Sequence, residues 1–285
     1  MNEIYAIDPC APQDIKDVVA MLNRFGMSNG VFIANYPKDW FVSLCEHVSK
    51  IGSLDRSRLC LMISNNMDSL LDVESEYKKV RTWDENVENL KIFSKVIAHV
   101  LASNPNSRGF PTLESFLWDL DDNKAGAARG SHIPMTAKSY MEAIRPLLLK
   151  STEVHLADSY FKLRDDYGRI DRRKSELLIS MLAAADESRR CERIFIHFKR
   201  LIECSEEAQE AQCIKDFDFI RSKAKKIECD IQFDLHNEMT HGRYIFSIKG
   251  GLQFDHGFLI NPLKKNHVHW LSKSELLPIQ SFYGL

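Results

Sequence analysis

In the first part of the chain the spacing at which hydrophobic residues recur changes several times, from the two-residue period of a strand to the three- and four-residue spacing of a helix. This pattern predicts a mixture of strands and helices. Residues 3–7 alternate as a short strand, and in residues 12–25 the apolar positions recur three and four apart, as on one face of a helix. A second strand and a second helix are expected over 30–37 and 39–52. The apolar run 58–63 fits a strand or a helix, and its length does not separate the two. A small α/β module is therefore expected.

The middle of the chain is predicted to hold one long helix followed by loops. Thr82, with Glu85 three residues later, has the pattern of a capping box, so a helix is expected to begin there and to continue to about residue 103. Residues 104–134 hold much of the chain's Pro and Gly, which predicts loops around one short apolar element, 116–120.

The domain boundary is expected near the end of a helix over 136–149. It separates an N-terminal α/β module of unknown role, 1–148, from a C-terminal domain, 149–285. The elements expected in the second domain are a strand at 153–161, a helix at 172–185, a strand at 193–198, a helix at 205–226 and strands at 227–235, 241–248 and 252–260. Two strand–helix units followed by a cluster of strands predict an α/β fold with a mixed sheet flanked by helices. The apolar stretch 276–285 is expected to dock onto the body of the protein rather than onto a partner.

Composition and charge narrow the class of protein. The 285 residues are 44% hydrophobic, enough for a sizeable buried core. The formal net charge of −2 argues against a dominant nucleic-acid-binding surface over the whole molecule, but it allows a local basic patch. No run approaches the roughly 20 apolar residues of a transmembrane helix, and the N-terminus lacks the basic start of a signal peptide. Seven scattered cysteines without a CxxC pair suit a reducing interior, so a soluble, cytoplasmic protein is expected.

One stretch, HGRYIFSIKGG at 241–251, has the pattern of a chemical site. His241 and Arg243 lie two residues apart and would share one side of a strand. A guanidinium can contact phosphate through two parallel hydrogen bonds. Lys249 precedes a glycine pair whose turn can expose backbone amides to an anion. We therefore predict a phosphate-binding site of His241, Arg243 and Lys249, with an ordinary strand and glycine hairpin turn as the structural alternative.

Two motifs in the C-terminal part resemble the phospholipase D-like superfamily. The sequence DSYF at 158–161 ends a predicted strand, and HGRY at 241–244 begins a later one. Members of that superfamily often have Asp-Pro-Tyr-Phe or a similar sequence at the first place and His-x-Lys or His-x-Arg at the second. The resemblance covers about residues 150–265 and implies a single degenerate half-domain; the N-terminal part shows no such resemblance.

The resemblance also implies how the site would work. In active members one histidine attacks phosphorus, a second protonates the leaving oxygen, and lysines hold the phosphate oxygens. That reaction needs two motifs, from a tandem repeat or from two subunits, and this chain shows one. Arg243 occupies the lysine position and Ile248 the position of the motif's aspartate. The resemblance thus implies phosphate binding without ester cleavage, and His241 is the expected catalytic residue only if a homodimer is active.

The expected function follows from the resemblance and from the basic residues. The resemblance implies a non-catalytic accessory subunit of a bacterial DNA-linked assembly, such as an anti-phage (antiviral) defence system, that binds partner proteins and a phosphate backbone. Two other functions stay open: a dimeric phosphodiesterase or nuclease, and a module that binds lipid headgroups. Contact with DNA or RNA would come from basic clusters that share a face. The residues expected in that contact are Arg172, Arg173, Lys174, Lys223, Lys225 and Lys226.

A pair of histidines near the C-terminus is the candidate for metal binding. His267 and His269 have the spacing that places two imidazoles on one side of a strand. Neither a carboxylate nor a cysteine in the immediate sequence completes a ligand set, although His236 and His256 flank the main motif. Neither a metal site nor a cofactor is therefore predicted.

Overall fold

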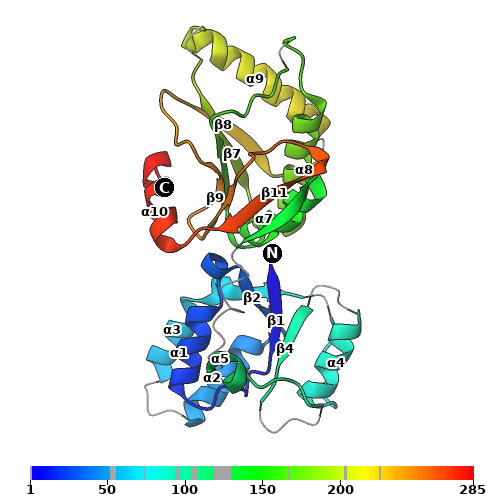
Figure 1. Cartoon of the computed structure of the whole chain (residues 1–285). Coiled ribbons are helices and arrows are strands. Elements are labelled where there is room, and N and C mark those ends of the chain that lie inside the picture. Colours follow the sequence, from blue (N-terminus) through cyan, green and yellow to red (C-terminus); the bar gives the residue numbers. More distant parts are fainter. Residues whose placement is uncertain are drawn as a thin grey trace. The chain divides into compact units, whose positions relative to one another are not determined.

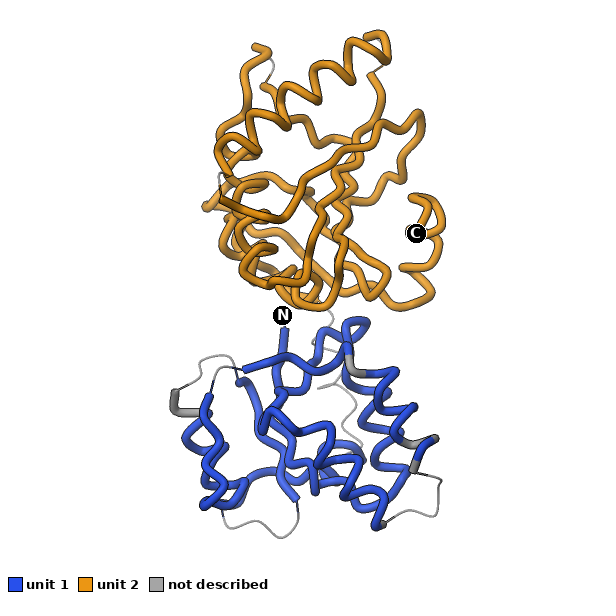
Figure 2. Tube along the Cα trace, turned by 180° about the vertical axis from the view of Figure 1, so that it is seen from behind, with its two compact units in different colours: residues 1–128 blue, residues 129–285 orange. Residues whose placement is uncertain are grey.

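The computed structural model divides the chain into two compact units, Met1–Ala128 (unit 1) and Arg129–Leu285 (unit 2), shown in Figure 2. The expected boundary at 148/149 is wrong, because strand β5 (Gly130–Met135) and helix α7 (Ala137–Lys150) are part of unit 2. β5 pairs with the strand Asn261–Trp270, and no local sequence pattern predicts this pairing. The residues that the structure describes are 2–51, 56–73, 75–93, 97–103, 108–118, 130–165, 167–201, 204–224 and 226–285.

Unit 1 contains a parallel sheet with strand order β3-β2-β1-β4. Figure 1 shows α1, α2 and α5 on one side of this sheet and α4 on the other. Its elements are β1 (Glu3–Ile7), α1 (Ile15–Arg24), η1 (Met27–Asn29), β2 (Val31–Asn35), α2 (Trp40–Ile51), α3 (Arg56–Ser64), η2 (Met67–Ser69), β3 (Leu70–Asp72), α4 (Trp83–Phe93), β4 (Ile97–Leu101) and α5 (Leu113–Trp118).

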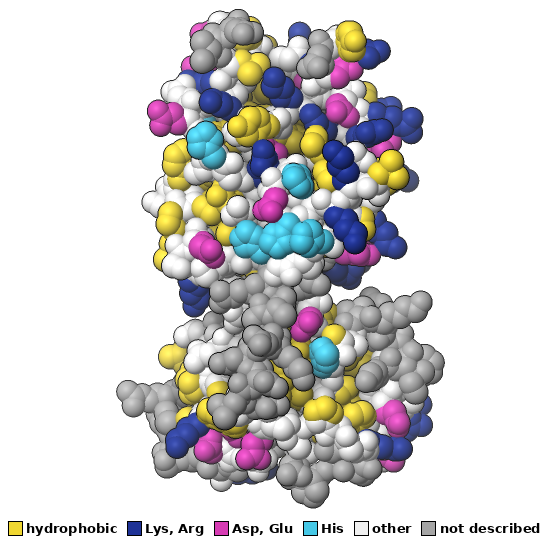
Figure 3. Space-filling view, in the orientation of Figure 1, with side chains coloured by type: hydrophobic (Ala, Val, Ile, Leu, Met, Phe, Trp, Pro, Cys, Tyr) yellow, Lys and Arg dark blue, Asp and Glu magenta, His cyan; other side chains and the backbone are white. Residues whose placement is uncertain are grey.

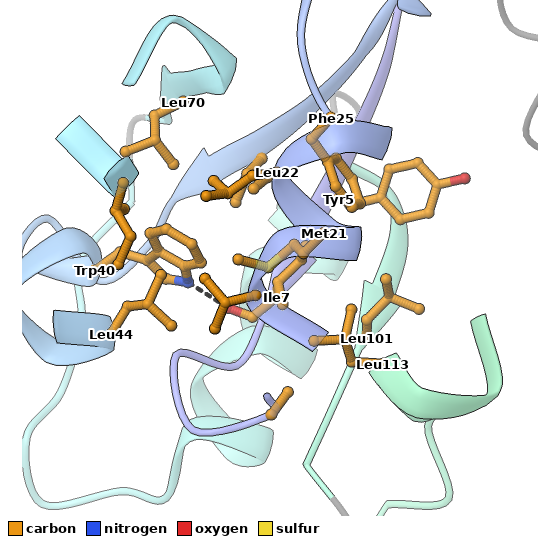
Figure 4. Close-up of a cluster of buried hydrophobic side chains, with 14 of the residues drawn as sticks. Tyr5, Ile7, Met21, Leu22, Phe25, Trp40, Leu44, Leu70, Leu101 and Leu113 are labelled. Atoms are coloured by element: carbon orange, nitrogen blue, oxygen red, sulfur yellow. Dashed lines mark hydrogen bonds between the residues drawn. The ribbon is translucent and has the colours of Figure 1, made fainter. Parts of the chain in front are cut away.

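The core of unit 1 forms where the first strand meets the first two helices. Ile7 of β1 packs among Met21 and Leu22 of α1 and Leu44 of α2 (Figure 4). Trp40, at the start of α2, is buried beside them, and its indole Nε1 donates a hydrogen bond to the carbonyl of Ile7 at 2.6 Å. The indole therefore fixes the helix to the end of the strand.

One expectation for unit 1 is changed by strand pairing, and one that was left open is decided. The single helix expected to continue from Thr82 to 103 is wrong, because α4 ends at Phe93 and β4 follows. β4 pairs in parallel with β1, which places Val100 and Leu101 in the core. The run 58–63 is helical, within α3. Pairing of β4 with β1 thus overrides the helical tendency expected for residues 97–101.

Unit 2 is a seven-stranded mixed sheet flanked by helices, which confirms the expected α/β fold (Figure 1). The strand order is β5-β11-β10-β9-β6-β7-β8; β6, β7 and β8 are parallel, and the other pairs are antiparallel. Besides β5 and α7 its elements are β6 (Glu153–Asp158), α8 (Arg172–Ser188), β7 (Arg193–Lys199), α9 (Glu206–Lys223), β8 (Asp230–His236), β9 (Arg243–Phe246), β10 (Gly251–Phe254), β11 (Asn261–Trp270) and α10 (Lys273–Tyr283).

The elements of unit 2 differ from expectation in the bounds of one strand and in the presence of β5 and α10, whereas the tail packs as expected. β10 is shorter than the expected strand 252–260, and the loops expected at 104–134 include β5. Helix α10 was not expected, although Ser272 and Glu275 form a complete capping box at its start. α10 packs on the sheet through Leu276, Ile279 and Tyr283, so the expected docking of the tail onto the body is confirmed. Among the helices of the described residues, none combines the length and apolar character needed to cross a membrane.

Candidate phosphate-binding edge of unit 2

The two motifs that carry the family resemblance lie next to each other in the fold. β6 and β9 pair antiparallel, and the register places Asp158 opposite Arg243. The guanidinium Nε of Arg243 lies 3.8 Å from a carboxylate oxygen of Asp158, and its Nη1 donates to the carbonyl of Asp255 at 2.6 Å. The same guanidinium lies over the ring of Tyr160, 5.1 Å from its centroid. Arg243 is therefore positioned from three sides at the carboxyl end of β6.

Asp158 is the buried partner of this arginine. Burial raises the pKa of the Asp158 carboxyl, while the backbone N–H of Tyr160 and the charge of Arg243 act in the opposite direction. Gly257 allows the close approach: a Cβ at this residue would lie 2.4 Å from the carboxylate and 2.8 Å from Cδ of Arg243, and its φ is +64°. The edge thus contains a compensated ion pair rather than a free guanidinium.

Removing the charge of Arg243 is expected to destabilise unit 2. The Arg243→Met variant keeps an alkyl chain against Tyr160 but leaves Asp158 buried without its cation. The carboxyl keeps the hydrogen bond from the backbone N–H of Tyr160 but loses the charge that compensates its burial. We therefore expect the free energy of unfolding to fall by about 1–3 kcal/mol in urea denaturation at pH 7. The double variant Asp158→Asn/Arg243→Met should recover most of the loss. If the double variant loses as much as the sum of the single variants, the ion pair is not coupled.

The three residues predicted to hold phosphate do not converge on one pocket. His241 is exposed just before β9, and Arg243 is engaged by Asp158 at the start of the strand. Lys249 lies beyond the other end of β9, in the turn to β10, where Ser247 and Gly250 close a hairpin through a 2.8 Å backbone hydrogen bond. From 243 to 247 the extended chain spans about 13 Å. The glycine pair therefore serves the hairpin, and Lys249 is separate from the other two.

The basic clusters expected to bind nucleic acid lie at opposite ends of the helical layer. α8 follows β6 and begins at the carboxyl end of the parallel strands with Arg172, Arg173 and Lys174, whereas α9 leads to the start of β8 and ends at Lys223. A 17-residue helix such as α8 is about 25 Å long. Lys226 follows α9, and Lys225 lies outside the described residues. The two clusters therefore do not form one footprint.

Each cation of the first cluster, at the start of α8, has a partner within the protein. The three cations differ in how far their charged groups are exposed. Arg172 is exposed and pairs with Glu176 at 2.8 Å. Nη1 of Arg173 lies 3.4 Å from the carbonyl of Ile260. Lys174 is mostly covered, and its Nζ donates to the carbonyl of Lys162 at 2.7 Å. Arg172 and Arg173 are thus the cluster's accessible charges.

Exposed aromatic rings next to this cluster are the feature that sequence reasoning missed. The side chains of Tyr160 and Tyr167, in the connection from β6 to α8, are 63% and 85% exposed. Each ring has an arginine over it: Arg243 at 5.1 Å from the Tyr160 centroid and Arg169 at 5.1 Å from the Tyr167 centroid. The alternation of tyrosines with basic residues between 160 and 173 was visible in the sequence. Only the fold places these residues at the carboxyl end of the parallel strands, where α/β sheets commonly bind ligands.

A chain of three histidines, one each from β6, β7 and β8, lies on the face of the sheet that α10 covers. Nδ1 of His155 lies 2.9 Å from Nε2 of His197, and Nδ1 of His197 lies 2.8 Å from Nε2 of His236. Tyr283 of α10 covers the last two rings. Burial lowers the pKa of His155 to about 4 and that of His197 to about 3, so both rings are neutral at pH 7.

The direction of the hydrogen bonds in this chain follows from the donors available. A neutral imidazole has one N–H and one acceptor nitrogen, so each ring can donate once. Nε2 of His155 is buried without a hydrogen-bond partner among the described residues, and an unpaired N–H there is avoided when His155 donates from Nδ1 to His197. His197 then donates from Nδ1, which lies 3.6 Å from the carboxylate of Asp234, to His236. The three rings therefore act as one structural unit.

Unit 1 has its own polar group at the carboxyl end of a strand. Asp8 follows β1 and is buried next to the point where β4 adjoins β1, the strand-order reversal at which such sheets commonly bind ligands. Its two oxygens accept from the backbone N–H of Cys10 at 2.9 Å and from the hydroxyl of Ser103 at 2.7 Å. The hydrogen bond from Ser103 ties the segment after β1 to the segment after β4.

The comparisons with known proteins do not identify a family. Matching the chain against protein-family models and against curated proteins gives no match. Among solved structures, the chain is similar to TrmBL2, described as an archaeal chromatin protein with a novel mode of DNA binding. The sequences are 9% identical, the TM-score is 0.27, and the match covers 60% of this chain and 56% of that chain. A TM-score this low establishes no common fold. None of these comparisons tests the phospholipase D-like resemblance, which stays a prediction.

Proposed function

We propose that unit 2 is a non-catalytic binding module whose ligand is single-stranded nucleic acid, held along the connection from β6 to α8. The observation that carries the proposal is the pair of exposed tyrosine rings, Tyr160 and Tyr167, each next to an arginine guanidinium. Proteins that bind single strands combine such stacking platforms with cations that follow the phosphate backbone. The wider role as a subunit of a DNA-linked assembly rests on the family resemblance alone.

The charges around the two rings suit a phosphate backbone. Arg172 and Arg173 lie at the start of α8, and Lys162 is exposed on the same connection. Part of the positive charge is compensated locally, since Arg169 pairs with Asp165 at 3.1 Å. A compensated surface of this kind favours stacking with bases over the purely electrostatic binding of a duplex.

Cleavage of the bound strand is not part of the proposal. The family reaction needs two histidines, and His241 is one exposed imidazole. Ile248, at the position of the motif's aspartate, offers no carboxylate. The lysine position holds Arg243, which is already paired with Asp158.

Replacing the two tyrosines is expected to abolish most of the binding. Stacking of a base on an aromatic ring contributes about 1–3 kcal/mol, so Tyr160→Ala and Tyr167→Ala should each weaken binding about tenfold. Fluorescence anisotropy with a labelled single-stranded oligonucleotide, as DNA and as RNA, measures this on the full chain. The matched control is Phe219→Ala, an exposed ring of α9 with Lys223 over it at 5.4 Å, which should leave binding unchanged.

The same assay separates the alternatives. Arg173→Glu should weaken binding and reduce its salt dependence, whereas Arg190→Glu, an exposed arginine beyond the other end of α8, should not. Equal binding by the wild type and the double tyrosine variant would contradict the proposal. Cleavage of the oligonucleotide that disappears in His241→Ala would establish the phosphodiesterase instead.

A further inference from the structure

We propose that unit 2 has a binding site for a divalent transition-metal ion on its open sheet face, with His267, His269 and Asp255 as ligands. The sequence pattern predicted no metal site, because the immediate sequence around the two histidines contains no carboxylate. The fold brings that carboxylate in from the neighbouring strand. Figure 3 shows a band of histidine side chains (cyan) low on unit 2, with an acidic side chain (magenta) beside it.

Strand register explains why these donors meet. β10 and β11 pair antiparallel with Phe254 opposite Val268, so the next residue, Asp255, lies opposite His267 and donates its backbone N–H to that residue's carbonyl at 3.1 Å. On the other side of β11, His132 of β5 lies opposite His267. Residues opposite each other on adjacent strands project to the same face. Pairing of β10 with β11 thus directs the carboxylate and the two imidazoles to one place, and β5 adds His132 beside them.

The distances between the side chains are those of a ligand set. One donor atom from each of Asp255, His267 and His269 lies within 4.8 Å of the other two. A carboxylate oxygen of Asp255 is 3.4 Å from Nδ1 of His267, and the rings of His267 and His269 have centroids 5.7 Å apart. The ring of His132 follows at 4.9 Å from that of His267. Ligands of one tetrahedral metal ion lie a little over 3 Å apart, so small side-chain rotations would complete the site.

A buried nitrogen supplies a second, independent observation. Nδ1 of His269 is buried and has no hydrogen-bond partner among the described residues. With the ring proton on Nε2, this nitrogen keeps a lone pair that no protein donor uses among the described residues, as a metal ligand requires. Gly130 lies opposite His269 in β5, and a Cβ at this position would be 3.0 Å from a ring nitrogen of His267. The glycine therefore keeps space for the two rings.

The donor types select the class of metal. Two imidazoles and one carboxylate suit zinc and other first-row transition metals, whereas Mg²⁺ and Ca²⁺ prefer oxygen ligands. Three protein ligands leave one position of a tetrahedral ion open, which is the arrangement of catalytic rather than structural zinc sites. The structure assigns the open position no substrate.

The second group of donors in unit 2 is a weaker candidate. Donor atoms of His197, Asp234 and His236 also lie close together. Both ring nitrogens of His197 are already engaged, one with His155 and one with His236, and the ring is 1% exposed. A metal ion would have to break this chain of hydrogen bonds. His267 and His269 are only partly buried, which gives an ion access to them.

Titration with Zn²⁺ alone tests the proposal. Untagged, EDTA-treated full-length protein should bind one equivalent in isothermal titration calorimetry, and Co²⁺ in its place should give the visible absorption of a tetrahedral site. Losing outer-shell partners alone lowers metal affinity about 10–100-fold, so His267→Ala and Asp255→Asn should weaken Zn²⁺ binding by about 100-fold or more. Asp255→Asn keeps the shape of the side chain, so it serves if the histidine variant unfolds.

Two control variants decide where the ion binds. His241→Ala removes an exposed histidine outside the cluster and should leave affinity and stoichiometry unchanged. His236→Ala should also leave them unchanged if the ion binds at the open face. The proposal is overturned if the wild type shows no saturable Zn²⁺ binding, or if His236→Ala abolishes binding while Asp255→Asn does not.

Discussion

Lowering the pH from 7 to 5 is expected to destabilise unit 2 by about 4 kcal/mol through the two buried histidines, His155 and His197. Burial lowers their pKa values to about 4 and about 3, from an ordinary value near 6.5. Between pH 6.5 and pH 4 the unfolded chain binds protons that the folded chain does not. Stability is therefore fully present above pH 6.5 and falls as the pH decreases. At pH 5 the loss is about 2 kcal/mol for each ring, since each pH unit below 6.5 corresponds to about 1.4 kcal/mol.

The groups around the two rings do not reverse this direction. The charge of Glu153 raises the pKa of His155 only in part, against the larger effect of burial. At His197 the neighbouring His155 and His236 act in the same direction as burial. Burial also lowers the pKa of His236, against the carboxylate of Asp234 and together with the charge of Arg200. Tyr283 covers this group and is neutral at these pH values, because its ordinary pKa, near 10, is raised further by burial.

Urea denaturation at pH 7, 6 and 5, with EDTA present, measures the effect. His155→Gln should remove about half of the pH dependence, although its stability at pH 7 will be lower because a packed ring is lost. His256→Gln, a change at an exposed histidine, should leave the pH dependence as it is in the wild type. An unfolding free energy that stays constant from pH 7 to pH 5 would show that the rings are protonated in the folded state and would contradict the account of their burial.

Replacing Trp40 with alanine is expected to destabilise unit 1 by about 3–5 kcal/mol. The side chain is 1% exposed, and the substitution would leave a cavity between β1 and α2 (Figure 4). It would also leave the carbonyl of Ile7 without the hydrogen bond from the indole. Domains of this size are stable by only about 5–15 kcal/mol, so the variant should lose a large part of the stability of the unit.

Calorimetry can separate this effect from unit 2, because the two units have separate cores. The unfolding transition of unit 1 should move to lower temperature, and that of unit 2 should not. Trp118→Ala is the matched control, since this tryptophan of the same unit is 54% exposed and is expected to cost far less. Equal losses in the two variants would mean that Trp40 is not a central core residue.

Local sequence signals predicted much of the parallel half of unit 2. β6, β7 and β8 and helices α8 and α9 were expected, with end points that differ by a few residues. Period and caps are properties of neighbouring residues, so they are readable in the sequence. Ser205, for example, accepts a hydrogen bond from the backbone of Ala208 at the start of α9, as a helix N-cap does.

Sequence reasoning singled out Arg243, His267 and His269, but it did not predict which residues the fold brings next to them. The two motifs of the family resemblance meet through Asp158 and Arg243, as an antiparallel pair. Lys249 was grouped with Arg243 because the two are near in sequence, but a strand separates them. Asp255 was not grouped with His267, although the two residues lie opposite each other across β10 and β11.

By itself the sequence determined an α/β protein, the order of strands and helices in the parallel half of unit 2, and a tail that packs on its own sheet. Only the tertiary structure decided the boundary between the units, the strand nature of β4 and β5, and the single sheet face that carries His132, His267 and His269 together with the buried histidine chain. The physical reason is that the period of a segment reports which side of it is buried, whereas strand partners are chosen by pairing between distant segments. The donors of the proposed metal site come from β11 and from the residue that follows β10, so their meeting is a property of the sheet register.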